Sequence, residues 1–243
     1  MSQRKNQHNA YVTAVYTRTH NDAIASSAYN AENGGRIYEM VNTNRTHAAT
    51  GDMGYSLPLD KKRNFFFTLS LRGNYRQNAD LSHINAANDA QGLLQQYGLT
   101  PNAVLSGAIG SNFRFSTRWN TSFSTIKQVG METRYRETTL LADFSWSLPW
   151  NLQLASDFRA MIYNGFADAS INKAHYKWNA SLARTFLADK LSVRLIANGI
   201  LTPHNNIHST LNATNRIESY TDILPRYFML SVVYTWDWTE KRK

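Results

Sequence analysis

Alternation of apolar and polar residues is the feature that most constrains the fold of this 243-residue chain. Near the C-terminus, every second residue from Phe228 is apolar or aromatic, whereas the set that begins at Met229 includes serine, threonine and aspartate. Successive side chains of a β-strand point to opposite faces, so this period predicts a strand with one apolar face. The pattern recurs in segments 65–75, 138–148, 150–162, 176–186 and 191–198, and more weakly in 10–19, 34–57, 102–115 and 118–128. The sequence therefore predicts an all-β chain of about ten strands.

Strand length separates two kinds of β protein. Many of the predicted strands reach about ten residues, whereas strands of soluble sandwiches usually have about 5 to 6. A membrane-spanning strand requires about 9 to 11 residues. Short and long connections also alternate, which is typical of an antiparallel up-and-down transmembrane barrel. The tight connections are expected at 59–64, 116–118, 148–151 and 188–190, and the long ones at 20–33, 78–101, 129–134, 164–174 and 201–216, with a short helix at 84–99.

The apolar side of the predicted strands is aliphatic in the middle and aromatic at the ends. In a membrane barrel, aliphatic side chains face hydrocarbon and aromatic rings gather at the two interfaces. The residues expected to face lipid or to form these girdles are Phe65, Phe67, Phe144, Trp146, Trp150, Trp178, Phe228, Leu230, Tyr234 and Trp236. The polar residues expected to face the lumen are Arg72, Asp143, Asp157, Arg159 and Arg194. Arg184 falls on the apolar side, which indicates either a side chain that extends to the interface or a bulge that shifts the register.

Composition excludes several classes of protein. The net charge is +9, but the basic residues are scattered and form no nucleic-acid-binding motif, so we expect no nucleic-acid partner. The chain has no cysteine, which excludes disulfides and thiolate metal sites. No segment approaches the roughly 20 apolar residues of a membrane helix, and the first residues lack the apolar core of a signal peptide. We therefore expect either a soluble protein or a membrane β-barrel whose export signal lies outside this sequence.

Candidate metal ligands and phosphate loops are weak. His204 and His208 have a spacing that binds metal on a helix, but Pro203 predicts a loop and no carboxylate is near. The glycines at 33–35 and 110–112 lack the lysine and the helix of a phosphate-binding loop. We expect no metal site and no cofactor.

A catalytic site is not expected either. Asp143, Asp157, Arg159 and Arg194 share the polar side of neighbouring strands, where buried charges need partners, so we expect an ion-pair ladder in the lumen. In the ten-stranded outer-membrane proteases, by contrast, acidic and histidine residues lie at the rim formed by the long loops. The two aspartates here lie near the tight turn at 148–151, which is the opposite end. We therefore expect no catalytic residues and no enzymatic activity.

Two stretches resemble a known family. The first, YNAENGGRIYEMVNTNRTHAATGDMGYSLPLDKKRNFFFTLSL, has a glycine turn (Gly34, Gly35), a strand with Asn42, and a second half-strand that ends in Pro58-Leu59 before a basic turn. The second, LPRYFMLSVVYTWDW, is similar to a closing barrel strand. Both resemble outer-membrane β-barrel proteins of the TonB-dependent receptor type. These stretches bracket nearly the whole chain.

The resemblance implies a specific function. Such receptors have a plug domain inside a barrel of about twenty-two strands and import siderophores, cobalamin or glycans across the outer membrane. This chain resembles only the C-terminal strands, a single partial barrel domain over residues 1–243 without a plug, so we expect it not to transport alone. The implied partners are outer-membrane lipid, the remaining strands and plug, a surface lipoprotein and the TonB energy-coupling complex. The family usually ends on an aromatic residue, whereas here Trp238 is followed by five more residues.

Two alternatives to the receptor-like barrel stay open from sequence. A soluble all-β ligand-binding module would bury one sheet face against another sheet. A ten-stranded outer-membrane barrel enzyme would carry acidic residues at the rim of the long loops. The receptor-like hypothesis instead places an apolar belt against lipid.

Overall fold

The structure, a computed structural model, describes residues 8–29, 35–80, 92–128, 131–166, 169, 172–201, 207–211, 216–220 and 226–236. Ten strands form one antiparallel sheet in the order β1-β4-β5-β6-β7-β8-β9-β10-β11-β14. These strands are β1 (Asn9–Thr19), β4 (Thr46–Pro58), β5 (Phe65–Asp80), β6 (Gly92–Ile109), β7 (Phe113–Gln128), β8 (Met131–Leu148), β9 (Leu152–Asn164), β10 (Ala174–Phe186), β11 (Leu191–Asn198) and β14 (Tyr227–Tyr234). The predicted all-β, up-and-down fold is confirmed. Among the described residues, no helix has the length and hydropathy to cross a bilayer.

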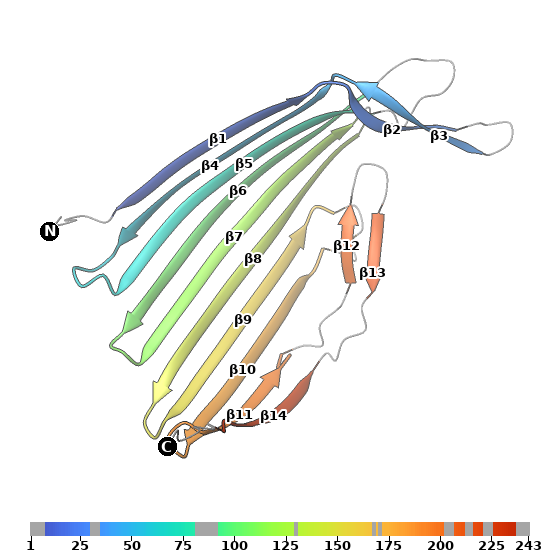
Figure 1. The fold of residues 1–243 in the computed structure, drawn as a ribbon. Helices are drawn as coiled ribbons and strands as arrows, with labels where there is room; N and C mark the ends of the chain where they lie inside the picture. The colour runs from blue at the N-terminus through green and yellow to red at the C-terminus, as the bar shows by residue number, and fades with distance from the viewer. Residues whose placement is uncertain are drawn as a thin grey trace, which may run out of the picture.

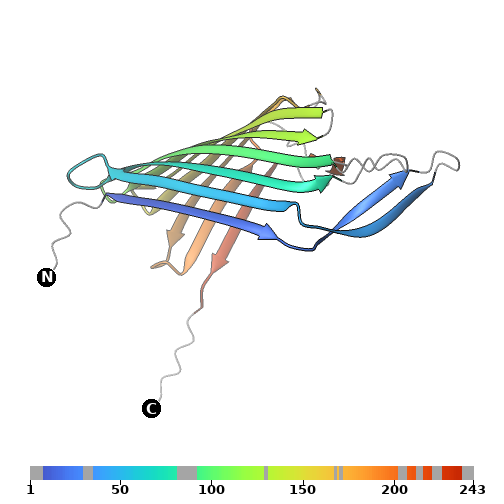
Figure 2. The same ribbon diagram turned by 90° about the horizontal axis from the view of Figure 1, so that it is seen from above.

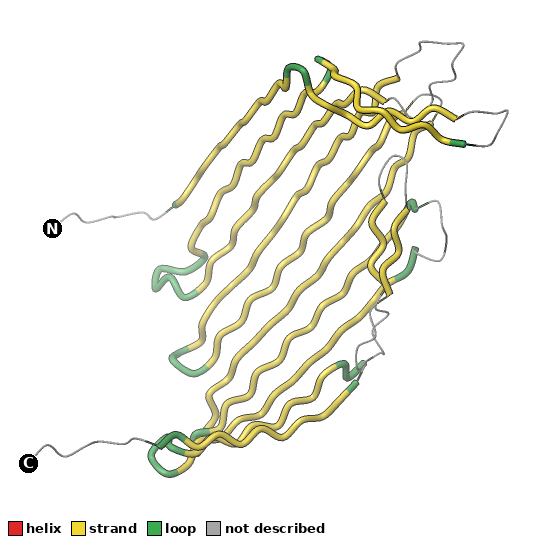
Figure 3. Tube along the Cα trace, turned by 45° about the vertical axis from the view of Figure 1, so that its right-hand side comes forward, coloured by secondary structure: helices red, strands yellow, loops and turns green. Residues whose placement is uncertain are grey.

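The connections differ between the two ends of the sheet. At one end, tight turns join β4 to β5, β6 to β7, β8 to β9 and β10 to β11. At the other end, two small hairpins interrupt the longest connections: β2 (Asp22–Tyr29) with β3 (Arg36–Thr43), and β12 (Ile207–Leu211) with β13 (Arg216–Tyr220). The start of β1 and the end of β14 both lie at the tight-turn end (Figure 1). Successive strands therefore alternate in direction across the whole sheet, as Figure 3 also shows.

The sheet is curved but open. Each neighbouring pair in the sequence order is hydrogen-bonded, whereas β1 and β14 each have a single strand neighbour among the described residues. They lie at opposite edges of the sheet in Figure 1, and the view from above in Figure 2 shows an arc and not a ring. The ten strands thus form a trough with two free edges.

A stagger in one direction runs across most of this trough. Phe65 of β5 pairs with Gly107, and β6 continues two residues further, to Ile109. The same offset recurs at the next two tight turns, where Phe113 pairs with Trp146 ahead of Leu148 and Leu152 pairs with Arg184 ahead of Phe186. At the last tight turn the offset is absent, because Leu191 pairs with Tyr234, the final residue of β14. A stagger of fixed sign is the geometric signature of strands tilted to a barrel axis.

Two predicted connections were wrong. The tight turn expected at 116–118 lies at 110–112, because Gly110 takes a φ of +63° that glycine tolerates and other residues avoid. Residues 116–118 belong to β7. The helix expected at 84–99 is also wrong for residues 92–99, which begin β6 and pair with β5, while residues 84–91 lie outside the described part. Strand pairing overrides the helical propensity of this glutamine- and leucine-containing stretch.

Other expected loops contain strands. Segment 20–33 includes β2, segment 129–134 includes the start of β8, and segment 201–216 includes β12. The single weak pattern over 34–57 resolves into β3 and β4. The boundaries were missed because short polar strands alternate too weakly to be distinguished from loops.

The sheet is a single layer without a hydrophobic core. Among the described residues, the only buried apolar side chains are Ala79, Ala160 and Ala183, and no large side chain is fully buried. A soluble sandwich of this length would bury many large apolar residues between two sheets. The structure therefore contradicts the soluble-module alternative.

A close contact between a glycine and an aromatic ring yields a test of the fold. A Cβ atom at Gly107 would lie 2.4 Å from Cδ1 of Phe65 and 3.1 Å from a backbone oxygen, whereas a Cβ at Gly73 has no atom within 4 Å. We expect Gly107→Leu to lower the free energy of unfolding by about 1–3 kcal/mol through overpacking, and the matched control Gly73→Leu to leave it within about 0.5 kcal/mol. Urea titration in detergent, followed by tryptophan fluorescence, measures both. Equal effects of the two substitutions would contradict this packing.

Candidate functional site

The strand register sorts the side chains of the main sheet into two faces. Directly paired residues of an antiparallel sheet project to the same side. One row runs from Phe65 through Gly107, Phe115 and Phe144. A parallel row on the other side runs through Asp52, Arg72 and Thr100. We call these sides the apolar face and the polar face.

The residues expected to face lipid fall together on the apolar face, with two exceptions. Those on this face are Phe65, Phe67, Phe144, Trp146, Trp178, Phe228, Leu230 and Tyr234. Trp150 lies in the turn between β8 and β9 with a φ of +61°, and Trp236 lies beyond the end of β14. All five residues expected to face the lumen, Arg72, Asp143, Asp157, Arg159 and Arg194, lie on the polar face.

Large apolar side chains on the apolar face are open to the surroundings. The exposed fraction is 77% for Phe228, 61% for Leu230 and 44% for Trp146. Similar exposure extends over the whole width of the sheet, from Val12 on β1 to Tyr234 on β14. Soluble monomers rarely expose contiguous apolar patches larger than a few hundred Å². The face therefore needs a covering, and nothing in the described part of the chain covers it.

Hydroxyl groups in the middle of the apolar face are hydrogen-bonded within the protein. The Oγ1 atoms of Thr121 and Thr138 lie 3.1 Å apart on neighbouring strands. Ser156 Oγ accepts a hydrogen bond from Trp178 Nε1 at 2.8 Å and donates to the backbone oxygen of Asn179. Internal pairing of this kind suits a surface against which no water is available.

A row of tyrosines marks one boundary of the apolar face. Tyr16, Tyr75 and Tyr97, which we call the tyrosine row, are aligned across β1, β5 and β6 near the long-loop end. Each hydroxyl forms a hydrogen bond with a polar residue in the next row of the same face, toward the long loops. The pairs are Tyr16–His47 Nδ1 at 2.8 Å, Tyr75–Gln77 Oε1 at 2.7 Å and Tyr97–Gln95 Oε1 at 3.1 Å. A ring over apolar neighbours with its hydroxyl among polar groups is typical of a membrane interface.

A second aromatic band lies near the tight-turn end. Its rings contact one another across β5, β7 and β8, with centroid separations of 6.1 Å for Phe65–Phe115, 6.0 Å for Phe113–Phe144 and 6.1 Å for Phe113–Trp146. From Phe65 to Tyr75 the strand advances ten residues, about 33 Å along its length and about 25 Å across a bilayer at a tilt near 40°. That height matches the apolar band of about 25 Å in outer-membrane barrels.

Arg184 resolves the choice left open by the sequence. The pairing of β10 with β9 and with β11 is continuous through Arg184, so no bulge shifts the register. Its guanidinium carbon lies 4.8 Å from the ring centroid of Phe186, on the turn side of the strand. The side chain thus extends toward the end of the sheet over an aromatic ring.

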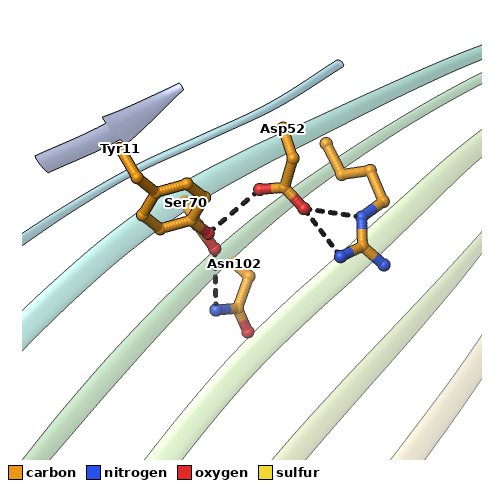
Figure 4. A network of polar contacts seen from close by, with 5 residues as sticks. Tyr11, Asp52, Ser70 and Asn102 are labelled. Atoms are coloured by element: carbon orange, nitrogen blue, oxygen red, sulfur yellow. Dashed lines mark hydrogen bonds and ion pairs between the residues drawn. The ribbon is translucent and has the colours of Figure 1, made fainter. Parts of the chain in front are cut away.

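The polar face carries a hydrogen-bonded cluster that sequence reasoning missed. Asp52 accepts two bonds from the guanidinium of Arg72, at 2.8 and 2.6 Å, and one from the hydroxyl of Tyr11 at 3.0 Å (Figure 4). The Tyr11 ring lies over Gly54, where a Cβ would be 2.4 Å away, so the glycine makes room for the ring. Beside it, Asn102 donates to Ser70 at 3.1 Å. The cluster ties the edge strand β1 to β4 and β5.

The ion-pair ladder expected among Asp143, Asp157, Arg159 and Arg194 is not present. Among the described side chains, the ion pairs are Arg72–Asp52, Lys127–Glu132 and Arg134–Glu132. Asp143 and Asp157 are instead directly opposite each other, and Asp157 accepts a hydrogen bond from Asn179 at 2.7 Å. These carboxylates are exposed, so solvent replaces the ionic partners that burial would require.

The structure describes one histidine of the candidate pair, His208 on β12. His204 lies outside the described residues, and the described part of the chain holds no group of three or more metal-ligating side chains.

The Asp52 cluster yields a test of how β1 is held. Asp52→Asn keeps the shape but removes the charge that strengthens the Arg72 bonds, so we expect the free energy of unfolding to fall slightly. Combined with Arg72→Gln, it should show a non-additive effect in a double-mutant cycle measured by urea titration. Tyr11→Phe, which retains the ring over Gly54, is the matched control with the smaller effect. Strict additivity of Asp52→Asn and Arg72→Gln would show that the pair does not stabilise the sheet.

Comparison with known proteins assigns the family. The model of the Outer membrane protein beta-barrel family matches residues 1–234, nearly the entire chain. No curated protein and no solved structure matches it. With its long staggered strands and one apolar face, the chain belongs to the outer membrane protein β-barrel family and is a protein of the outer membrane.

Proposed function

We propose that this protein forms part of the wall of an outer-membrane transport barrel related to TonB-dependent receptors. Its apolar face contacts lipid and its polar face lines an aqueous lumen. The observation that carries this proposal is a single open sheet whose large apolar side chains are exposed on one face, with hydroxyls paired internally between two aromatic bands. Lipid covers such a face without requiring hydrogen bonds from it.

The free edges favour a partial barrel. In the described residues, β1 and β14 each pair on one side only, and the arc in Figure 2 leaves them apart. Additional strands between these edges would complete the backbone pairing and widen the lumen enough for a plug domain. The chain is then inactive alone and works together with the remaining strands and the plug.

The character of the polar face fits passage of hydrophilic solutes. Arg118, Arg159 and Lys177 lie along one row across β7, β9 and β10, and Asp143 and Asp157 form the next row. Exposed charges of both signs hold water in a lumen and offer contacts to polar ligands. On the resemblance of the sequence, the ligand class is a siderophore, cobalamin or glycan, delivered with a surface lipoprotein and driven by the TonB energy-coupling complex. We assign the protein no enzymatic role.

The orientation of the two faces can be tested with single cysteines, because the chain contains none. On β9, Asp157→Cys and Arg159→Cys lie on the polar face, whereas Leu154→Cys and Phe158→Cys lie on the apolar face. We expect a charged, membrane-impermeant maleimide to label the first pair at least tenfold faster in outer membranes, because thiolates form in water and not in hydrocarbon. Labelling after unfolding in detergent is the control for total thiol. The reverse pattern would place lipid on the polar face and refute the proposal.

Transport itself can be tested in cells that naturally produce this protein. Removal of residues 1–243 should reduce uptake of at least one of three probes, a ferric siderophore, cyanocobalamin or a maltooligosaccharide, to the level of cells without the gene. Inactivation of the energy-coupling complex should cause the same loss for the same probe, which separates active import from passive leakage. Unchanged uptake of every probe would refute nutrient transport while leaving the barrel assignment intact.

A further inference from the structure

A groove on the apolar face lies next to the tyrosine row. It has a volume of ≈ 560 Å³ and crosses β1, β4, β5 and β6 near the long-loop end. Its floor contains Gly51 and Gly73, which are directly paired, and the small side chains of Ala14 and Ala49. The rings of the tyrosine row form its wall. Pockets that hold small ligands usually have volumes of about 300–1,000 Å³.

No contact within the described part of the chain explains the two floor glycines. At Gly54, Gly98 and Gly107, a neighbouring side chain fills the space that a Cβ would need, at 2.2 to 2.4 Å. At Gly73, no atom lies within 4 Å, and at Gly51 the nearest is a backbone oxygen at 3.9 Å. Neither residue has a positive φ among those described. Glycine weakens a strand interior and often marks the close approach of a ligand, so the vacant floor indicates an occupant from outside.

Basic side chains flank the wall of this groove. At the β1 end of the row, Arg18 follows Tyr16 by two residues on the same face, is exposed and forms no ion pair among the described side chains. At the other end, Lys127 Nζ lies 5.9 Å from the ring centroid of Tyr97 but is paired with Glu132 at 3.8 Å. Four strand spacings of about 4.8 Å separate it from Arg18. A negatively charged group beside Tyr16 would therefore face the unpaired charge of Arg18.

We propose that the groove binds one acidic membrane lipid, with an acyl chain over Gly51 and Gly73 and its phosphate at the tyrosine row beside Tyr16 and Arg18. This inference rests on the proposed lipid-facing orientation of the apolar face. We assign a lipid as the occupant because the apolar floor lies on the inner side of the tyrosine row and the basic residues lie on its outer side. An acyl chain and its phosphorylated headgroup have the same order. Basic residues at a membrane surface attract acidic lipids in the same way.

Native mass spectrometry of the detergent-extracted protein tests this site, with phosphatidylglycerol and phosphatidylcholine of identical acyl chains as probes. We expect one tightly retained phosphatidylglycerol and weaker binding of phosphatidylcholine. Arg18→Gln should weaken phosphatidylglycerol binding about fivefold and leave phosphatidylcholine unchanged. Gly73→Leu fills the floor and should weaken both at least tenfold. Ala142→Leu, on the apolar face of β8 outside the groove, is the matched control and should change neither.

Each result decides a separate point. Wild-type lipid binding by Gly73→Leu would overturn the groove as the site. Equal affinity for the two lipids in the wild type would overturn the role of Arg18. A dimer that Gly73→Leu dissociates would identify a second copy as the occupant and refute a lipid.

Gly51→Leu replaces Gly73→Leu if Gly73→Leu loses the heat-modifiable gel mobility that indicates a folded barrel. A normal cysteine-labelling pattern with no lipid retained would reject this inference alone, whereas an inverted pattern would reject the proposed function as well.

Discussion

Backbone pairing within a single layer is the interaction on which this structure depends. Ten strands are each hydrogen-bonded to their neighbours, and the described residues bury only three alanines as an apolar core. Packing of large side chains between layers therefore contributes little to the fold, unlike in a soluble domain. Such a sheet is stable only where one face meets an apolar medium that offers no competing hydrogen bonds. Lipid has this property, and the family assignment places the chain in the outer membrane.

The polar groups follow from the same constraint, and their positions match the band expected of an outer-membrane barrel. In the middle of the apolar face, the hydroxyls of Thr121 and Thr138 are hydrogen-bonded to each other, and the hydroxyl of Ser156 accepts a hydrogen bond from the indole of Trp178. Each of these polar groups therefore has a partner within the protein. At the tyrosine row, hydroxyls turn toward His47, Gln77 and Gln95, where polar side chains begin. On the opposite face, by contrast, Asp143, Asp157 and Arg159 are exposed and form no ion pair among the described side chains. The chemistry of each face thus matches the medium that we propose for it.

Sequence reasoning predicted the faces well because alternation is a local property of each strand. The registers place Phe65, Phe144 and Leu230 on one face and Arg72 and Asp157 on the other, as the period indicated. Partners across strands were not predictable, because pairing depends on an offset that no single strand encodes. Tyr11 and Asp52 are 41 residues apart, and Asp52 lies in a weakly alternating segment between glycines. The turn at Gly110 and the strand at 92–99 were missed where local propensity competed with pairing.

The edges restrict what can complete the barrel. Each unpaired backbone group costs several kcal/mol in hydrocarbon, so a sheet with two bare edges does not persist in a bilayer. Soluble proteins protect free edges with lysine or proline, yet β14 contains neither, and its apolar side chains extend to the edge, as does Val12 on β1. On the proposal of a partial barrel, the strands that complete the pairing must therefore continue the same apolar face and the same stagger. That requirement admits further strands of a larger barrel and excludes a polar loop or helix as the neighbour.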